Sequence, residues 1–228
     1  MASNTTARGE RRGLSVDRVA PLAGLASVVA LVAGGSAADM GGNGLSPTMS
    51  PQLLATELRD RAGELEVGAS LVALSSVLFL VFLGPVWTRL HAASTALAVV
   101  GVSAGAVVAA QGLAFARESI ALGTAATLGD GETAQVLLTS GWDTARLIAA
   151  PYLPLIAVTA LAGFAHGTFS RWFTWFSAAM AVLVCLSFSP VGPAGVLGLT
   201  GTVWVVVASL YLAAARPSAA SAASAVSG

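Results

Sequence analysis

The fold is decided by residues 67–87, which read VGASLVALSSVLFLVFLGPVW and contain no charged side chain. A bilayer has a hydrocarbon core of roughly 30 Å, and about 20 helical residues are needed to cross it. Apolar and polar side chains do not alternate between Val77 and Leu83, as they would in a strand of a membrane barrel. Because backbone amides in hydrocarbon must be paired within their own segment, we predict a transmembrane helix.

Five other apolar stretches have the same character. With the first, they give predicted spans at 19–38, 67–87, 92–115, 145–165, 172–190 and 194–214. The sequence therefore predicts an all-α, polytopic bundle of six transmembrane helices, with the membrane domain at 19–215. Residues 1–18 and the Ser/Ala-rich residues 216–228 are predicted to be disordered tails, because they cannot bury enough apolar surface to offset the entropy of ordering.

The composition excludes several other classes of protein. Of the 228 residues, 56% are hydrophobic and 10% are charged, whereas a soluble domain averages about a quarter charged. All basic residues are arginines, which excludes a P-loop lysine, a Schiff-base lysine and a lysine-rich nucleic-acid surface. The single cysteine, Cys185, excludes an intramolecular disulfide and multi-cysteine metal sites. We expect the lipid bilayer as a partner and no nucleic acid.

The arginines also predict the orientation, because cytoplasmic loops carry an excess of positive charge. A cytoplasmic N-terminus leaves Arg59, Arg61, Arg117 and Arg146 outside and the other seven arginines inside. Nine of the eleven acidic residues then lie outside. We therefore predict a multi-pass plasma-membrane protein with both termini in the cytoplasm.

A cleaved signal peptide is the competing interpretation of the first span. Arg11 and Arg12 precede an apolar stretch that ends in Ser36-Ala37-Ala38, which is similar to a small-residue cleavage site. Cleavage there would leave five spans and an external N-terminus. The apolar stretch is longer than the usual 7–15 residues of a signal peptide, which favours six spans.

The first external segment has the pattern of an amphipathic helix. Ser50 and Pro51 are a typical helix start, with a hydroxyl cap and proline at the first helical position. An apolar stripe and an acidic face follow at helical spacing; their members are Leu54, Leu58, Ala62 and Leu65, and Glu57, Asp60 and Glu64. Since no helix breaker intervenes, we predict one helix from 51 to 87.

The second external segment is also predicted to be an amphipathic helix. Asp130 can cap it, and it continues through Val136 and Ser140 toward the fourth span, with Gly141 as a weak point. Each external helix thus leads into a span.

Most of the polar residues near the membrane gather in the outer half of the predicted bundle. The predicted ligand-pocket residues are Gln111, Trp142, Arg146, Pro151, Tyr152 and Pro154, and the candidate acids for catalysis are Asp143, Glu118 and Glu64. Proline removes a backbone donor, so Pro151 and Pro154 are expected to free the carbonyls of Leu147 and Ala150. The alternative is structural: Asp143 can pair with Arg146, and Gln111 can make one interhelical hydrogen bond.

The other polar and small residues do not indicate a reaction or a ligand. His91 and His166 are both predicted at the cytoplasmic side, and no third ligand is near them in the sequence, so we predict no metal site and no cofactor. Gly101, Gly105 and Gly112 allow another helix to approach closely. The sequence leaves open whether that helix belongs to the same bundle or to a dimer.

Three segments resemble a known class of proteins. They are the acidic segment LLATELRDR at 53–61, the span end GPVWTRL at 84–90 and the segment SRWFTW at 170–175. Together with the Arg-bearing N-terminus, this layout resembles the small multi-span integral membrane proteins abundant in actinobacteria, which are known as hypothetical proteins and domains of unknown function. The resemblance implies a plasma-membrane location in a high-GC bacterium and supplies no catalytic residues.

Three functions are compatible with the sequence. The first is a non-enzymatic accessory or assembly partner, whose external helices contact another membrane protein or a second copy of the chain. The second is a membrane-embedded enzyme for a lipid or isoprenoid, with acid chemistry like that of terpene cyclases in an outward-facing polar pocket. The third is a small transporter or channel subunit, suggested by the prolines of the fourth span.

Overall fold

The protein is all-helical over the residues that its computed structural model describes, which are 19–38, 48–147, 150–187 and 194–215, without the side chains of 38, 142–147, 187 and 194–198. No strand occurs among them. The helices are α2 (Leu22–Ala38), α3 (Pro51–Asp60), α4 (Ala62–Ala93), α5 (Thr95–Leu128), α6 (Gly131–Leu147), α7 (Tyr152–His166), α8 (Arg171–Ser187) and α9 (Ala194–Ala214). The all-α prediction is confirmed for this part of the chain, and both predicted tails lie outside it.

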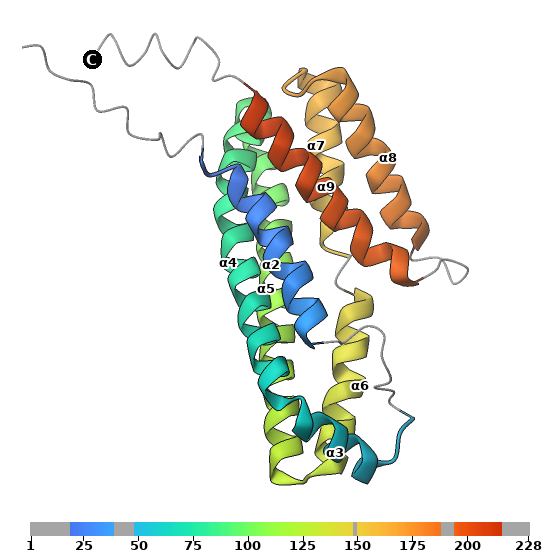
Figure 1. Cartoon of the computed structure of the whole chain (residues 1–228). Coiled ribbons are helices and arrows are strands. Elements are labelled where there is room, and N and C mark those ends of the chain that lie inside the picture. The colour runs from blue at the N-terminus through green and yellow to red at the C-terminus, as the bar shows by residue number, and fades with distance from the viewer. Residues whose placement is uncertain (1–18, 39–47, 148–149, 188–193, 216–228) are drawn as a thin grey trace, which may run out of the picture.

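Helices α4 and α5 form an antiparallel hairpin that runs the length of the molecule (Figure 1). They contain 32 and 34 residues, which makes each about 50 Å long at 1.5 Å per residue. Among the described helices, these two are long and apolar enough to cross a membrane. A helix also covers most of each of the other four predicted spans, but α2, α7, α8 and the described part of α9 are shorter.

The hairpin contains a zone without charged side chains. In α4 it extends from Val67 to Thr88 and in α5 from Thr95 to Ala116. Each stretch of 22 residues is about 33 Å long, close to the roughly 30 Å of a bilayer core. Gly112 faces Ser76, and Gly105 faces Leu83, so the two charge-free stretches lie side by side.

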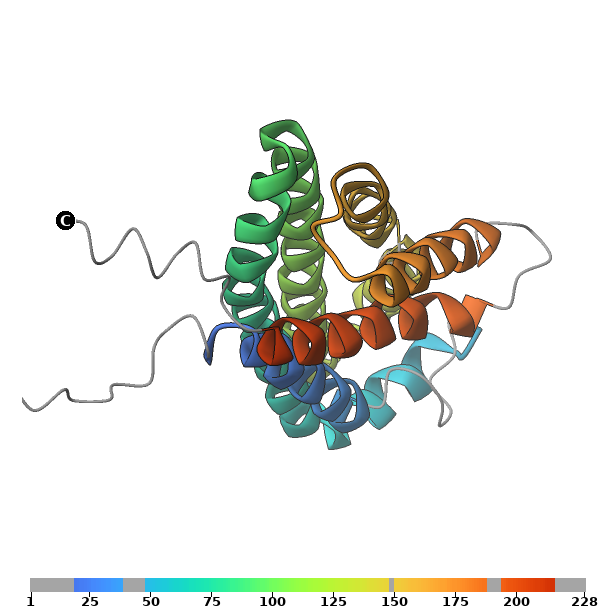
Figure 2. The same ribbon diagram turned by 90° about the horizontal axis from the view of Figure 1, so that it is seen from above.

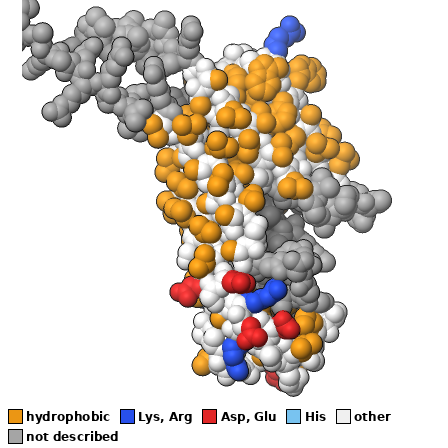
Figure 3. Space-filling model, in the orientation of Figure 1, with side chains coloured by type: hydrophobic (Ala, Val, Ile, Leu, Met, Phe, Trp, Pro, Cys, Tyr) orange, Lys and Arg blue, Asp and Glu red, His pale blue; other side chains and the backbone are white. Residues whose placement is uncertain are grey.

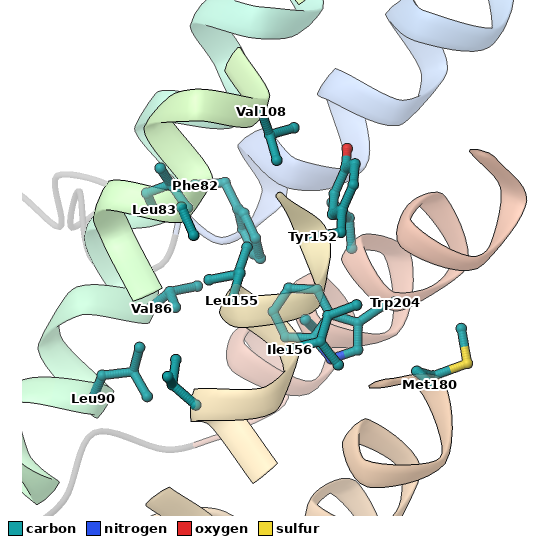
Figure 4. Packing of buried hydrophobic residues seen from close by; sticks show 14 of the residues in the cluster. Phe82, Leu83, Val86, Leu90, Val108, Tyr152, Leu155, Ile156, Met180 and Trp204 are labelled. Carbon is teal, nitrogen blue, oxygen red and sulfur yellow. The ribbon is translucent and has the colours of Figure 1, made fainter. Parts of the chain in front are cut away.

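The main core surrounds this zone, where α2, α7, α8 and α9 pack with the hairpin (Figures 1 and 2). Figure 4 shows Leu155 of α7 pointing toward Phe82 and Val86 of α4, while Ile156 lies beside Trp204 of α9. The indole Nε1 of Trp204 donates a hydrogen bond of 3.1 Å to a buried serine hydroxyl of α8. Close packing and such interhelical hydrogen bonds are what hold helices together in lipid.

Glycines allow several of these helices to touch. A Cβ at Gly101 would lie 2.7 Å from Leu90 Cδ1, and one at Gly201 would lie 2.8 Å from the ring of Tyr152. A Cβ at Gly34 of α2 would lie 2.8 Å from the backbone oxygen of Gly68 in α4. The small residues of α5 that could have served either the bundle or a dimer therefore pack inside this chain.

A second, separate core lies at one end of the hairpin. We call this end the head; it consists of residues 51–66 and 117–147, which include α3, the start of α4, the end of α5, and α6 (Figure 1). Its buried residues are Leu54, Leu58, Leu65, Leu122, Ala125, Ala126, Ala134 and Leu138. The three leucines of the predicted apolar stripe are thus buried and its Ala62 is half-buried, while Glu57, Asp60 and Glu64 of the acidic face are exposed as expected.

Three boundaries differ from the prediction. The helix expected from 51 to 87 is interrupted at Arg61, which has φ −103° and ψ 6°, because α3 turns to bury Leu58 in the head core. Helix α5 does not stop near residue 115 but continues to Leu128, where Gly129 ends it in the left-handed region with φ 77°. The span predicted at 145–165 contains the end of α6 and the start of α7 at Tyr152.

The prolines of α7 also behave differently from the prediction. Pro151 is the residue before the helix and Pro154 is in its first turn, where backbone N–H groups have no helical partner in any case. The carbonyl of Ala150, expected to be free, accepts a hydrogen bond of 3.2 Å from the backbone N–H of Leu153. The side chain of Leu147 and residues 148–149 lie outside the described part of the chain.

Charge and hydrophobicity are segregated along the molecule. In the view of Figure 3, hydrophobic side chains cover the bundle, and acidic and basic side chains gather on the head. The start of α2 and the end of α9 both lie at the end opposite the head (Figure 1). The head is therefore at one end of the molecule, and the two ends of the described helical region are at the other.

Candidate functional site

Two of the predicted site residues, Gln111 and Glu118, lie on one face of α5. They are seven residues apart, which is two helical turns or about 10 Å. Val108, one turn before Gln111, is buried in the main core, and Leu122, one turn after Glu118, is buried in the head core. Both polar residues therefore occupy the junction between these two cores, where a small third cluster of Ala69, Val72 and Ala116 is buried.

The carboxyl group of Glu118 faces α6. Ser140 donates a long hydrogen bond of 3.5 Å from its Oγ to Glu118 Oε1. The adjacent Gly141 has no side chain, and a Cβ there would lie 3.8 Å from Glu118 Oε2. That second oxygen and Oε1 of Gln111 are both buried, and neither has a hydrogen-bond partner in the described part of the protein.

Ser140 is a neighbour of Glu118 that the sequence did not reveal. The contact links residues 22 apart in the chain, across the turn between α5 and α6. It exists because α5 continues past Glu118 as a helix, so that α6 can fold back along it. The i, i+7 spacing of Gln111 and Glu118 was the available signal, but it has meaning only on a helix that extends beyond residue 115.

The aromatic and proline candidates belong to the core. Tyr152 is buried at the start of α7, where its ring packs edge-on against Phe79 at a centroid distance of 6.0 Å and against Gly201 of α9. Pro151 and Pro154, on either side of it, are half-buried. This group holds the start of α7 against α4 and α9.

The remaining candidates are not brought to the junction by any described contact. Glu64 is exposed on the head near the start of α4. Trp142, Asp143 and Arg146 belong to α6 by their backbone, but their side chains lie outside the described part of the structure, so their roles stay predictions.

The two histidines are both exposed. His91 stacks on Trp87 at a centroid distance of 5.3 Å, and its Nδ1 lies 3.5 Å from the hydroxyl of Thr95. Across the described residues, no group of three or more His, Cys, Asp or Glu side chains is arranged to hold a metal ion.

The head presents apolar side chains to its surroundings. Leu53 of α3 is 50% exposed, Val136 of α6 is 68% exposed and Leu128 at the end of α5 is 79% exposed. Seven acidic and three basic side chains are described on the same head. Sequence patterning did not single out these apolar residues, because only the folded head shows which side of α6 is covered.

The first turn of α6 is fixed by Asp130, as its position in the sequence predicted. Its Oδ1 accepts a hydrogen bond of 3.0 Å from the backbone N–H of Thr133, and its Oδ2 accepts one of 2.6 Å from the Thr133 hydroxyl. These bonds, first from the side chain and then from the backbone, lower the pKa of the Asp130 carboxyl. The cap therefore acts best when Asp130 is ionised.

Comparisons with models of protein families, with curated proteins and with solved structures gave no match for this chain.

Proposed function

We propose that this protein is a six-span protein of the plasma membrane that holds the head on the outer side. The charge-free zone of α4 and α5 supports this, since its length of about 33 Å fits a bilayer core. Large apolar side chains face outward over that zone, among them Leu80, Val107, Leu183 and Val203. An exposed apolar surface of this kind is expected where lipid covers the protein.

The shorter helices are compatible with this arrangement. Helix α7 has 15 residues and α8 has 17, which gives lengths of about 23 and 26 Å. A bilayer accommodates short helices by local thinning at modest cost. Trp172 and Trp175 are exposed at the start of α8, the residue type that favours membrane–water interfaces.

The distribution of charge supports an external head and cytoplasmic termini. Arg89 near the end of α4 and Arg171 at the start of α8 flank the charge-free helices on the side away from the head. The head is rich in acidic side chains. Because positively charged loops are retained in the cytoplasm, this polarity favours the head outside.

We propose that the head is a docking module and the protein is a non-enzymatic accessory or assembly partner of another membrane or surface protein. The observation that carries this proposal is that the head has its own buried core and is continuous with the membrane hairpin through α5. A folded module on a continuous helix keeps a fixed position above the membrane. Its exposed apolar residues within an acidic surface suit a partner with an apolar centre and basic edges.

Crosslinking in the native membrane tests this docking role. We would crosslink cells that express the tagged full chain, purify the product and compare the wild type with Val136→Glu. The matched control is Thr139→Glu, which adds the same charge at another exposed position of α6. We expect a defined crosslinked partner that Val136→Glu loses and Thr139→Glu keeps. A chain that gives no crosslinked product in its own membrane, or one that keeps its partner in Val136→Glu, would contradict the docking role.

A further inference from the structure

One long face of α5 is not covered by any described helix. Helix α5 packs against α3, α4, α6 and α7, and its glycines lie on that buried face. On the other side of the helix, exposed residues follow one another at alternating steps of three and four. One helix packs along another in a left-handed pair with this spacing. We call this face the α5 seam; within the charge-free zone its members are Ala96, Val99, Ser103, Ala106, Ala110 and Leu113.

The middle of the α5 seam has smaller side chains than the neighbouring surface of α4. The large apolar residues that α4 exposes in the charge-free zone are Leu74, Val77, Leu80 and Val81. The α5 seam has Ser103, Ala106 and Ala110 in the middle of this zone. Alanine and serine are typical of positions where two membrane helices approach closely. The α5 seam therefore has the composition of a helix contact rather than that of a lipid-covered surface.

Ser103 is the polar residue at the centre of this contact. It comes eight residues after Thr95, which places it about 12 Å from the inner end of a zone about 33 Å long. Its side chain is exposed at that depth. Hydrocarbon offers a hydroxyl no hydrogen-bond partner, whereas serine side chains bond across the contacts between membrane helices.

The α5 seam continues beyond the membrane into the head (Figure 1). After Arg117 at the boundary, Ile120, Thr124 and Thr127 are exposed with the same spacing. Ile120 is 49% exposed, and it lies beyond the charge-free zone, where lipid does not cover it. The surface thus suits a helix that leaves the membrane and continues outside it, as α5 itself does.

We infer that the occupant of the α5 seam is the same seam of a second copy of this chain, so that the protein is a parallel dimer. Two copies in one membrane have the same orientation, and a twofold axis along the membrane normal brings equal depths together. A hydroxyl both donates and accepts, so Ser103 suits a contact with its own copy. The one charged residue of the seam, Arg117, lies at the outer boundary, where its long side chain reaches the lipid phosphates.

The α5 seam has the area that a stable dimer needs. The 34 residues of α5 are about 50 Å long, and a helix with its side chains is about 10 Å wide. Contact along the whole seam covers about 500 Å² on each chain, or about 1,000 Å² in total, which is the lower limit for a specific interface. Helix α8, with 17 residues, offers about half of this area. The dimer rests on the proposed crossing of the membrane by the hairpin and is independent of docking at Val136.

Disulfide crosslinking of the full chain in its native membrane tests the dimer. Single cysteines are introduced in a Cys185→Ser background, and the membranes are oxidised with copper phenanthroline. Near a twofold axis a cysteine meets its own copy, so Ser103→Cys and Ala110→Cys are each expected to give a product with twice the mass of one chain. Because the dimer raises the effective concentration of the two thiols, we expect about tenfold more product than from a control position.

The matched control is Val77→Cys on α4. Gly112 of α5 faces Ser76 of α4, so Val77 lies at about the depth of Ala110, and it is 52% exposed. We expect this variant to remain monomeric. Equal crosslinking at Val77 and Ala110, or no crosslinking at Ser103 and Ala110, would overturn the inference. A product whose mass is not that of two chains would show another protein on the seam and would overturn it as well.

Energy transfer between copies that carry donor and acceptor tags tests the dimer without a cysteine in the seam. We expect transfer between wild-type chains. Ala110→Phe, which is too large for close approach, is expected to weaken the dimer about tenfold, whereas Val77→Phe is expected to leave it unchanged. Both positions are exposed, so neither substitution changes a buried side chain. Wild-type chains without transfer would refute the dimer.

Labelling in the same cells separates failure of the dimer from failure of the membrane placement. Thr139→Cys on the head is labelled from outside by a maleimide that cannot cross membranes if the hairpin spans the membrane as proposed. External labelling together with absent energy transfer would refute the dimer alone. Absent labelling in intact cells would refute the placement on which the dimer rests.

Discussion

Asp130 shows how a single side chain stabilises a helix at the surface of the head. Its two hydrogen bonds to Thr133 satisfy a backbone donor of the first turn of α6 and fix the Thr133 hydroxyl. The same bonds depress the pKa of the carboxyl in the folded protein. The stabilisation is therefore present above the ordinary aspartate pKa and is lost as the pH falls through the depressed value.

We expect that Asp130→Ala lowers the melting temperature of the head at neutral pH. Because the variant lacks this carboxyl, its stability is also expected to fall less than that of the wild type when the pH is lowered. Thermal unfolding of both proteins between neutral pH and about pH 3, followed by circular dichroism, measures both effects. Glu132→Gln, an exposed neighbour, is the control. A difference between wild type and Asp130→Ala that does not shrink at low pH would argue against the cap.

Two glycines of the head are predicted to respond in opposite ways to alanine. A Cβ at Gly131 would overlap the backbone oxygen of Pro51, whereas a Cβ at Gly63 meets nothing within 4 Å. Gly131→Ala is expected to destabilise the head by about 1–3 kcal/mol through overpacking. Gly63→Ala is expected to stabilise it by about 0.5–1 kcal/mol through helix propensity. Chemical denaturation of both variants checks the signs, and a neutral Gly131→Ala would mean that α3 and α6 do not touch there.

At the scale of residues, local signals were predictable and long-range contacts were not. The Asp130 cap depends on a residue three positions away, so the sequence contains all of it. The environment of Glu118 depends on Ser140, which lies on another helix. No spacing rule within one helix could have indicated that contact.

At the scale of helices, the head is a packing unit of its own. Its core residues come from four helices and are distinct from those of the main core. Helix α3 leaves the direction of α4 at Arg61 so that Leu54 and Leu58, both 0% exposed, face α5 and α6. The break thus arises from packing between helices, which is why no helix breaker marks it in the sequence.

Truncating a core leucine is expected to unfold the head alone. Leu58→Ala should cost about 2–5 kcal/mol, as buried leucines do, whereas Leu53→Ala at an exposed position should change stability by about 0.5 kcal/mol or less. Hydrogen exchange by mass spectrometry is the measurement. We expect faster exchange in α3 and α6 of Leu58→Ala with α7 to α9 unchanged. Faster exchange throughout the chain would show that head and bundle form a single cooperative unit.

The lengths of the helices could be predicted only where hydrophobicity determines them. The apolar part of α5 was recognised as the span 92–115, but its last 13 residues lie beyond that span and were not predicted to continue the helix. Their helical structure depends on Leu122 and Ala126 being buried by α3 and α6. The exposed residue Leu128 was missed for the same reason, and so was the contact of Ser140 with Glu118, although Glu118 itself was a predicted candidate acid.

At the scale of the whole molecule, α2 is an integral part of the bundle. Ser27 Oγ lies 3.4 Å from Ser75 Oγ of α4, and a Cβ at Gly24 would lie 2.6 Å from the ring of Phe82. Removing residues up to Ala38 would expose these contacts. We therefore expect the protein purified from its own membrane to retain α2, with an intact mass near 22.6 kDa. A mass that corresponds to a start at residue 39 would support signal cleavage instead.

The central claim is that the hairpin crosses the membrane and carries the head on the outer side. Labelling of introduced cysteines in intact cells tests it most directly, in a Cys185→Ser background that removes the only native cysteine. Thr139→Cys is exposed on the head, and Ala92→Cys is exposed at the opposite end of the hairpin. With a maleimide that cannot cross membranes, we predict that Thr139→Cys is labelled in intact cells and Ala92→Cys only after permeabilisation. The reverse pattern, or labelling of both positions in intact cells, would contradict the account.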